Sequence, residues 1–442
     1  MRIVQISRWD KTGGAATAAY RLHDSLRKSG CDSILYVLDK VTNDLQVHLF
    51  KQPRDVESMV NLYWRRARVF LNLARYYQTI PGGYDRFSQP IAKYGKAVVR
   101  QLPPSDIVNL HWITGFVDLA DFFSLVKKPL VWTLHDMNAF TGGCHYDWDC
   151  GKFSNGCGGC PQLGSDRDLD LSRRMWERKK SIYGSIDSKR LTIVTPTRWL
   201  MTLAKQSPLL SRFPMKVVPY GIDTDLFSPK PVAVYKNDLG IKSEETVLLF
   251  VAQSIKNRRK GFHLLSEAVK ELKTTAQKLV LISVGVHHQE VSTPLRHIAL
   301  GEVKNDELLS MIYNVADIFV MPSLQDNLPN TVIESIACGT PVVCFKIGGV
   351  SEMIKSGVNG MALDEANVKS LVNGISELVS NRELRAALSQ GARQVAEREY
   401  DSKKQSERYL QIYQEMMTWQ REGELDNSGS ADLSCAPSSY SQ

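Results

Sequence analysis

Short apolar runs alternate with longer segments of helical spacing along most of this chain. Each run is four to eight residues long and is bounded by polar residues, proline or glycine, which is typical of a buried strand. The predicted strands are 4–7, 33–38, 106–112, 129–136, 190–196, 216–219, 246–251, 278–285, 318–321 and 342–345. Continuous apolar strands separated by helices indicate parallel sheets with helices on both faces. The pattern therefore predicts an α/β fold.

The strands fall into two successive series. A chain of 442 residues is too long for one hydrophobic core, so more than one domain is expected. Proline and polar residues follow residue 227 up to Gly240, as in a linker between domains. We place the boundary near residue 229, which gives a first domain of 1–229 and a second of 230–400. The segment 422–442 is rich in Ser, Asp and Gly and is predicted to be disordered.

Residues 53–100 interrupt the first domain as a largely helical insertion. The apolar positions on one side of this helix are Leu62, Val69, Phe70, Leu73 and Tyr76. The opposite side carries Arg68 and Arg75. One interpretation is a helix packed on the first domain. The other is a basic, aromatic surface for peripheral association with a membrane or for a lipid-linked acceptor.

Composition narrows the class of protein. Hydrophobic residues make up 43% of the chain and charged residues 23%, as in a folded soluble protein. No apolar run is long enough to span a bilayer and no signal-peptide pattern is evident, so we expect a cytoplasmic location or the inner face of the cell membrane. The net charge of +8 favours anionic partners such as nucleoside diphosphates or acidic headgroups. Nucleic acid is not expected, because no nucleic-acid-binding motif is evident.

Four cysteines cluster in the glycine-rich loop 142–161. They are Cys144, Cys150, Cys157 and Cys160. Four thiols within one loop match the ligand set of a tetrahedral structural zinc ion. Such a zinc would order the loop without performing chemistry, because four sulfur ligands leave no coordination position open. An iron–sulfur cluster, a redox pair and thiols that bind nothing are the alternatives.

The stretch 322–343 carries the strongest candidate chemistry. The strand 318–321 ends at a proline, a polar loop follows, and a helix is predicted from Thr331 to Cys338 with Asn330 as its cap. Unpaired N–H groups and the helix dipole make such a junction an anion site. Glu334, one turn inside the helix, can accept hydrogen bonds from sugar hydroxyls, and Asp326 lies in the loop before it. The pattern indicates a phosphate-plus-polyol site; its alternative is an ordinary strand–turn–helix with two surface acids.

Three other parts of the sequence contain residues suited to bind a phosphate or a sugar. Gly13 and Gly14 precede a helix, where glycine lets the backbone approach a phosphate. The G-x-G-x-x-G fingerprint is absent there, which argues against a nicotinamide enzyme. His111 and His135 end successive strands, where ligands of open parallel sheets gather. A basic loop follows the strand 246–251 and contains Arg258, Arg259 and Lys260.

The stretch 318–349 resembles the Glu-x7-Glu region of the retaining glycosyltransferases of family 4, which have the GT-B fold. The resemblance covers roughly residues 1–420. It implies two Rossmann-like domains that face each other across a cleft, with a final helix, 401–421, returning to the first domain. The second acid of the motif, which holds the nucleotide ribose, is Glu334 here. The first acid lies beside the donor sugar, and its place is taken by Asp326, one methylene shorter.

The same resemblance implies roles for other residues. It places His135 near the donor sugar and the reacting centre. It assigns neutralisation of the leaving diphosphate to Lys260 together with Arg258 or Arg259. The residues expected to bind the donor are Gly13, Gly14, Arg258, Val303, Asn327, Leu328, Pro329, Asn330, Thr331 and Glu334. The implied catalytic set is His135, Arg259, Lys260 and Asp326.

The implied activity is transfer of a sugar from a nucleoside diphosphate, UDP or GDP, to a hydroxyl of a saccharide or lipid-linked saccharide with retention of configuration. The cysteines and the H-D-x5-G-G-C-H-Y stretch that starts at His135 resemble a subgroup that builds bacterial surface polysaccharides, of exopolysaccharide or colanic-acid type. No cofactor is expected for the chemistry itself. Two alternatives remain: a nucleotide-sugar 2-epimerase of GT-B fold and a non-catalytic protein that binds nucleotide sugars.

Overall fold

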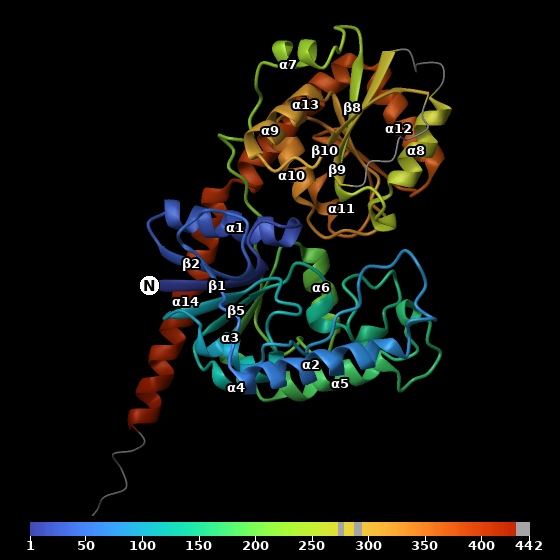
Figure 1. Ribbon diagram of the computed structural model, residues 1–442. Helices are drawn as coiled ribbons and strands as arrows, with labels where there is room; N and C mark the ends of the chain where they lie inside the picture. Colours follow the sequence, from blue (N-terminus) through green and yellow to red (C-terminus); the bar gives the residue numbers. More distant parts are fainter. Residues whose placement is uncertain (273–277, 287–293, 430–442) are drawn as a thin grey trace, which may run out of the picture.

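The computed structural model describes residues 1–272, 278–286 and 294–429 and shows two α/β domains (Figure 1). The sheet of the first domain has the strand order β3-β2-β1-β4-β5-β6-β7, and every pair of neighbours is parallel. Its strands are β1 (Arg2–Trp9), β2 (Asp32–Asp39), β3 (Val47–Leu49), β4 (Ile107–Leu110), β5 (Leu130–Thr133), β6 (Leu191–Thr195) and β7 (Met215–Val217). Its helices are α1 (Gly14–Lys28), α2 (Val56–Ala74), α3 (Lys96–Arg100), α4 (Leu119–Leu125), α5 (Leu171–Gly184) and α6 (Arg198–Gln206).

The second domain repeats the arrangement with the parallel strand order β10-β9-β8-β11-β12-β13. Its strands are β8 (Thr246–Ser254), β9 (Leu279–Val286), β10 (Arg296–Gly301), β11 (Ile318–Met321), β12 (Val342–Phe345) and β13 (Gly360–Leu363). Its helices are α7 (Ala233–Asp238), α8 (Phe262–Glu271), α9 (Asp306–Val315), α10 (Asn330–Ala337), α11 (Val350–Met353), α12 (Val368–Ser380) and α13 (Arg382–Glu399). The predicted fold class, two parallel-sheet α/β domains, is confirmed.

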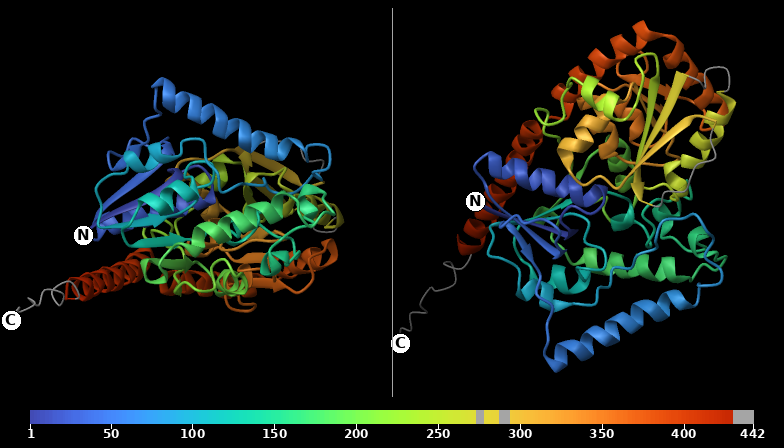
Figure 2. Two further views of the ribbon diagram at one scale, coloured as in Figure 1. Left: turned by 90° about the horizontal axis from the view of Figure 1, so that it is seen from below. Right: turned by 45° about the horizontal axis from the view of Figure 1, so that its top comes forward.

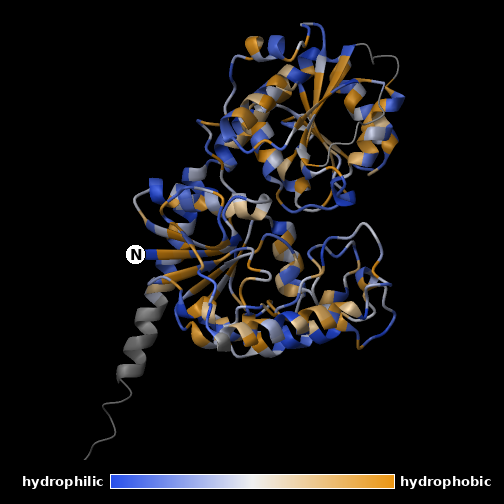
Figure 3. Ribbon diagram, in the orientation of Figure 1, coloured by the Kyte–Doolittle hydropathy of each residue, from blue (hydrophilic) through white to orange (hydrophobic). Residues whose placement is uncertain are grey.

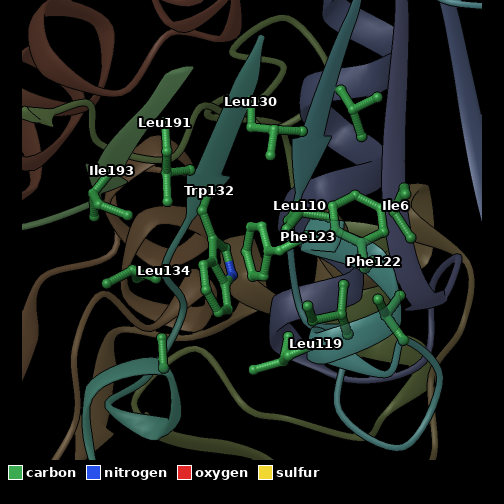
Figure 4. Close-up of a cluster of buried hydrophobic side chains, with 14 of the residues drawn as sticks. Ile6, Leu110, Leu119, Phe122, Phe123, Leu130, Trp132, Leu134, Leu191 and Ile193 are labelled. Atoms are coloured by element: carbon green, nitrogen blue, oxygen red, sulfur yellow. The ribbon is translucent and has the colours of Figure 1, made fainter. Parts of the chain in front are cut away.

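Apolar side chains from the strands and the covering helices form the core of each domain. In the first domain Trp132 of β5 packs against Phe123 of α4, with ring centroids 5.8 Å apart (Figure 4). All four residues of β5 are buried, as expected for a central strand covered on both faces. The apolar runs of the sequence therefore mark the middle of each sheet.

A long last helix, α14 (Ser402–Gly429), crosses back from the second domain to the first (Figure 1). Tyr409 and Tyr413 are buried against α1 and the first sheet. The Tyr413 hydroxyl bonds the Asn109 side chain at 2.9 Å, and the Tyr409 hydroxyl bonds Thr133 at 3.0 Å. The helix continues through residues 422–429, for which the sequence predicted disorder; the rest of that predicted tail, 430–442, lies outside the described residues.

The insertion 53–100 differs from the sequence prediction. Only α2 and the short α3 are helical, and residues 75–95 between them form turns and irregular structure. Proline and glycine at 81–83 and the proline at 90 explain why no helix continues through this segment. None of the helices within the described ranges combines the length and the apolar character needed to cross a membrane.

Candidate active site between the two domains

A cavity of about 620 Å³ lies where the carboxyl ends of the two sheets face each other. In open parallel sheets this edge is where ligands bind. The first domain contributes the loops after β1, β4 and β5 and the irregular segment with Asp85 and Ser88, and the second contributes the loops after β8 and β11. The predicted site residues on its wall are Gly13, Gly14, His135, Arg259, Lys260, Asp326, Asn327, Leu328, Pro329, Asn330 and Thr331.

A buried charge cluster occupies the second-domain wall. Lys260 Nζ lies 2.5 Å from Asp326 Oδ2, and Arg259 Nη1 lies 3.3 Å from the same oxygen. Burial raises the pKa of Asp326, but the charges of Lys260 and Arg259 outweigh burial and hold that pKa below its usual value. Asp326 is therefore a carboxylate at neutral pH, fixed between two cations.

Arg259 is also held from the first domain. Its Nε lies 2.9 Å from Asp85 Oδ2, and its guanidinium carbon lies 4.0 Å from the centre of the Tyr146 ring. The neighbouring Arg258 is exposed and does not line the cavity. A 3-10 turn over Arg258–Lys260 sends the adjacent side chains in different directions. Of the two candidate arginines, the one at the cavity is thus Arg259.

Glycine is required directly after these cations. Gly261 has φ +71°, and a Cβ at this position would lie 1.8 Å from the carbonyl oxygen of Pro322. The basic turn after β8 and the loop after β11 therefore pass in backbone contact. This contact brings Lys260 next to Asp326, although 66 residues separate them.

His135 lies at the end of β5 in a chain of hydrogen bonds. Its Nδ1 is 2.7 Å from the Tyr220 hydroxyl and its Nε2 is 3.0 Å from His111 Nδ1. Burial lowers the pKa of His135 to about 4, so the ring is neutral at pH 7. The backbone carbonyl of His135 accepts a hydrogen bond from Asn327 Nδ2 at 3.1 Å. The histidine is thereby joined to the loop that carries Asp326.

The glycine pair faces the second domain directly. Gly13, with φ +88°, lies opposite Gln253, and the carbonyl of Gly14 accepts a hydrogen bond from Asn330 Nδ2 at 2.8 Å. The predicted capping role of Asn330 is wrong: α10 begins at Asn330, follows Pro329 and has no side-chain cap. The Asn330 amide instead bridges the two domains, and the start of α10 points at the glycine loop.

Two predicted donor residues lie away from the cavity wall. Glu334 is buried one turn along α10, 2.8 Å from Arg21 Nη2 and 2.9 Å from the Tyr313 hydroxyl. Val303 is partly buried and packs against the apolar core of the second domain. Neither lines the cavity.

The first-domain wall holds residues that the sequence prediction missed. Asp136 Oδ2 lies 2.6 Å from His145 Nδ1, and His145 Nε2 lies 2.9 Å from the Ser88 hydroxyl. Burial raises the pKa of Asp136, but the charge of His145 and its hydrogen bond hold that pKa below its usual value. The Trp112 ring stacks on His145, with centroids 5.4 Å apart. Asp136 directly follows His135 and had a positional signal, whereas Ser88 had none.

The four cysteines of the loop 142–161 line a second, small cavity of about 20 Å³. The Gly142 N–H donates to Cys157 Sγ at 3.2 Å, and burial raises the pKa of Cys157 to about 12. Within the described ranges, no three side chains of His, Cys, Asp or Glu are placed to hold a metal ion. The thiols thus share one cavity without forming a metal-binding geometry.

Comparisons with known proteins agree with this architecture. Residues 232–395 match the family described as Glycosyl transferases group 1. A Bacillus subtilis protein named as a teichuronic acid biosynthesis glycosyltransferase, TuaC, is 25% identical over 288 residues, which are 63% of each chain. A D-inositol 3-phosphate glycosyltransferase of Geodermatophilus obscurus is 31% identical over 197 residues, 41% of this chain and 43% of its own. These matches span less than two thirds of the relatives' own length.

Solved structures match over nearly the whole chain. Sucrose-phosphate synthase of Thermosynechococcus elongatus has a TM-score of 0.64 at 16% identity and covers 95% of this chain and 99% of its own. HepE of Anabaena, solved with UDP and glucose, has a TM-score of 0.63 at 16% identity and covers 93% and 99%. The chain therefore has the GT-B fold of glycosyltransferases. Its match to the group 1 glycosyl transferases lies in the second domain.

Proposed function

We propose that this protein transfers a sugar from a nucleoside-diphosphate donor to a hydroxyl acceptor with retention of configuration. The observation that carries the proposal is the cationic pair of buried Arg259 and partly buried Lys260, fixed on Asp326 in the interdomain cavity beside the start of α10. The shared fold with HepE, which was solved with UDP and glucose, favours a uridine nucleotide.

The cluster suits departure of a diphosphate. Negative charge grows on the leaving oxygen as the anomeric C–O bond breaks, and preorganised cations stabilise it in a site with little water. Lys260 and Arg259 supply two positive charges, and the N–H groups of Asn330 and Thr331 at the start of α10 add partial positive charge. These groups stabilise the negative charge on the leaving oxygen, so the proposed reaction does not require a metal cofactor.

The acceptor would meet the first-domain wall. The Ser88 hydroxyl, bonded to His145 and through it to Asp136, offers a directed hydrogen bond to a sugar hydroxyl. Trp112 stacks on both Trp9 and His145 and so holds this histidine in place. A saccharide or lipid-linked saccharide fits this wall. The name of the relative TuaC, a teichuronic acid biosynthesis glycosyltransferase, supports a role in assembling a bacterial surface polysaccharide.

A donor screen tests the activity. The protein is mixed with UDP-, GDP- and ADP-sugars, and unfolding temperature and release of free sugar are measured. One donor at a hundredfold excess over its Kd should stabilise the protein by about 2.7 kcal/mol and slowly release its sugar. Anomeric NMR of the product should show retention.

The same screen separates the alternatives. An epimerase would convert the donor to its 2-epimer without an acceptor. A binding protein would be stabilised by a donor that stays intact with every acceptor tried. Stabilisation by no nucleotide sugar would contradict the proposed function.

We also propose that the four-cysteine cavity holds one structural zinc. Four thiols around a space of about 20 Å³ provide the ligand set, and the N–H of Gly142 already bonds a sulfur, as thiolates accept in metal sites. Zinc would draw the sulfurs closer and lower the pKa values of Cys144, Cys157 and Cys160, which burial raises. Elemental analysis of protein prepared without chelator should find about one zinc per chain. The substitutions Cys157→Ser and Cys160→Ser should remove the zinc, while Cys31→Ser, outside the loop, should not; metal-free wild-type protein would overturn the site.

A further inference from the structure

The outward side of α2 is an exposed apolar surface, called here the outer face of α2. Its side chains are 50–69% exposed: Met59, Val60, Tyr63, Trp64, Phe70 and Leu71. The opposite side of the helix, with Leu62, Val69 and Leu73, packs on the first domain. In both views of Figure 2 the helix lies at the edge of the molecule with no other element beyond it. The sequence prediction placed Phe70 on the packed side, and the structure places it on the outer face.

The outer face has the geometry of a helix lying in an interface. At about 100° per residue its six side chains fall within an arc of about 140°. Arg66 lies on one edge of this arc, and Arg68 and Arg75 lie on the other. In Figure 3 orange, apolar residues and blue, polar residues both occur along this helix. Beyond the helix, Tyr77 and Ile80 are also exposed.

The charges on this segment are of one sign. Residues 58–80 contain four arginines and no acidic residue. Arg65 turns inward to Asp118 and Asp121, at 2.8 and 2.7 Å. Arg66, Arg68 and Arg75 are exposed and take part in none of the ion pairs among the described residues.

We propose that the outer face of α2 docks on a bilayer containing anionic lipids, with its apolar side chains inserted at the level of the headgroups. Aromatic residues between rows of arginine match such a surface, since the rings enter the interface and the cations meet the lipid phosphates. A second copy of the chain fits less well, because two such faces would oppose their arginines without an acid to pair them.

The outer face of α2 is connected to the candidate active site through the chain that follows the helix. The chain leaves α2 and runs through residues 75–89 directly to the cavity, where it supplies Asp85 and Ser88. A membrane on α2 would therefore hold the first-domain wall near the lipid surface. The docking itself does not depend on the proposed activity.

Co-sedimentation of the full chain with vesicles tests the proposal. The chain should bind phosphatidylcholine vesicles containing about one third phosphatidylglycerol, and salt should weaken the binding. The substitutions Trp64→Ser, Phe70→Ser and Leu71→Ser should each lower the partition coefficient about tenfold. Arg66→Gln and Arg68→Gln should each lower it about fivefold on anionic vesicles only. Val234→Ser, an equally exposed apolar position on α7, should leave binding unchanged.

Two results would overturn the proposal. One is wild-type protein that does not bind, or apolar variants that bind like wild type. The other is a dimer in solution that these substitutions dissociate, which would assign the face to a second copy. Since the changed side chains are exposed, thermal unfolding should match wild type. Donor hydrolysis is also measured without vesicles. Protein that hydrolyses the donor but does not bind vesicles contradicts the docking alone, whereas protein that binds vesicles but hydrolyses no donor contradicts the proposed function alone.

Discussion

The substitution Lys260→Ala is expected to lower the rate of sugar transfer by about 10²- to 10³-fold. The ammonium group is fixed on Asp326 before any donor arrives, so it needs no rearrangement to stabilise the departing diphosphate. Its loss removes one full charge from a cavity where Coulomb interactions are stronger than in water. Most of the effect should fall on kcat, because the charge on the leaving oxygen grows in the transition state. Steady-state kinetics with the donor found by the screen measures it.

Two controls on the same turn separate chemistry from local disturbance. Lys256→Ala changes an exposed lysine of this turn and should leave the rate unchanged. Arg258→Ala removes an exposed arginine that does not line the cavity and should also have little effect, whereas Arg259→Ala should be as costly as Lys260→Ala. A loss of less than tenfold for Lys260→Ala, in protein that unfolds like wild type, would contradict the assigned role.

The sequence predicted the centre of both sheets and missed three of their four edge strands. The central strands are buried on both faces and appear as plain apolar runs, as at residues 318–321. The strands β3, β10 and β13 were not predicted, and each lies at the edge of a sheet. Edge strands are only partly buried, so their residues need not be apolar. Without an apolar run, these segments give no signal in a single sequence.

The candidate site follows a similar division. Residues at the ends of central strands, such as His135 and Lys260, could be placed because parallel strands deliver their loops to one edge. Ser88 could not be placed, since it reaches the cavity on an irregular segment whose path depends on contacts with the other domain. Arg259 illustrates this, because its choice over Arg258 rests on pairing with Asp85 across the cleft. Such pairings join residues that are far apart in the sequence, so the spacing of residues does not predict them.

The helix α2 shows a limit of periodicity itself. Both of its sides are apolar, so the pattern could not tell which side packs on the first domain. The partly buried pairing of Arg65 with Asp118 and Asp121 fixes the rotation of the helix, and neither partner is near in sequence. Phe70 was assigned to the wrong side for this reason.

The second large effect is expected on the affinity for the nucleotide, when the carboxylate proposed to bind its ribose is removed. Glu334→Ala should raise the Kd of the nucleoside diphosphate about 10- to 100-fold, the cost of losing hydrogen bonds to a charged group. In the structure this carboxylate contacts Arg21 and Tyr313. Glu334 does not line the cavity while Arg21 covers it, so the ribose hydroxyls are expected to take the place of Arg21 on this carboxylate, which keeps its bond to Tyr313. Isothermal titration calorimetry measures the affinity directly.

A substitution of Arg21, which pairs with Glu334, shows why Glu334→Ala would bind the nucleotide more weakly. Arg21 belongs to the first domain, so its pairing with Glu334 joins the two domains without a nucleotide. If Glu334 serves only as that interdomain contact, Arg21→Gln should weaken nucleotide binding as much as Glu334→Ala does. If Glu334 holds the ribose, Arg21→Gln frees the carboxylate, and the affinity should stay the same or rise. Unchanged affinity in Glu334→Ala would remove this residue from the donor site, because a buried carboxylate that bonds the ribose cannot be deleted without cost.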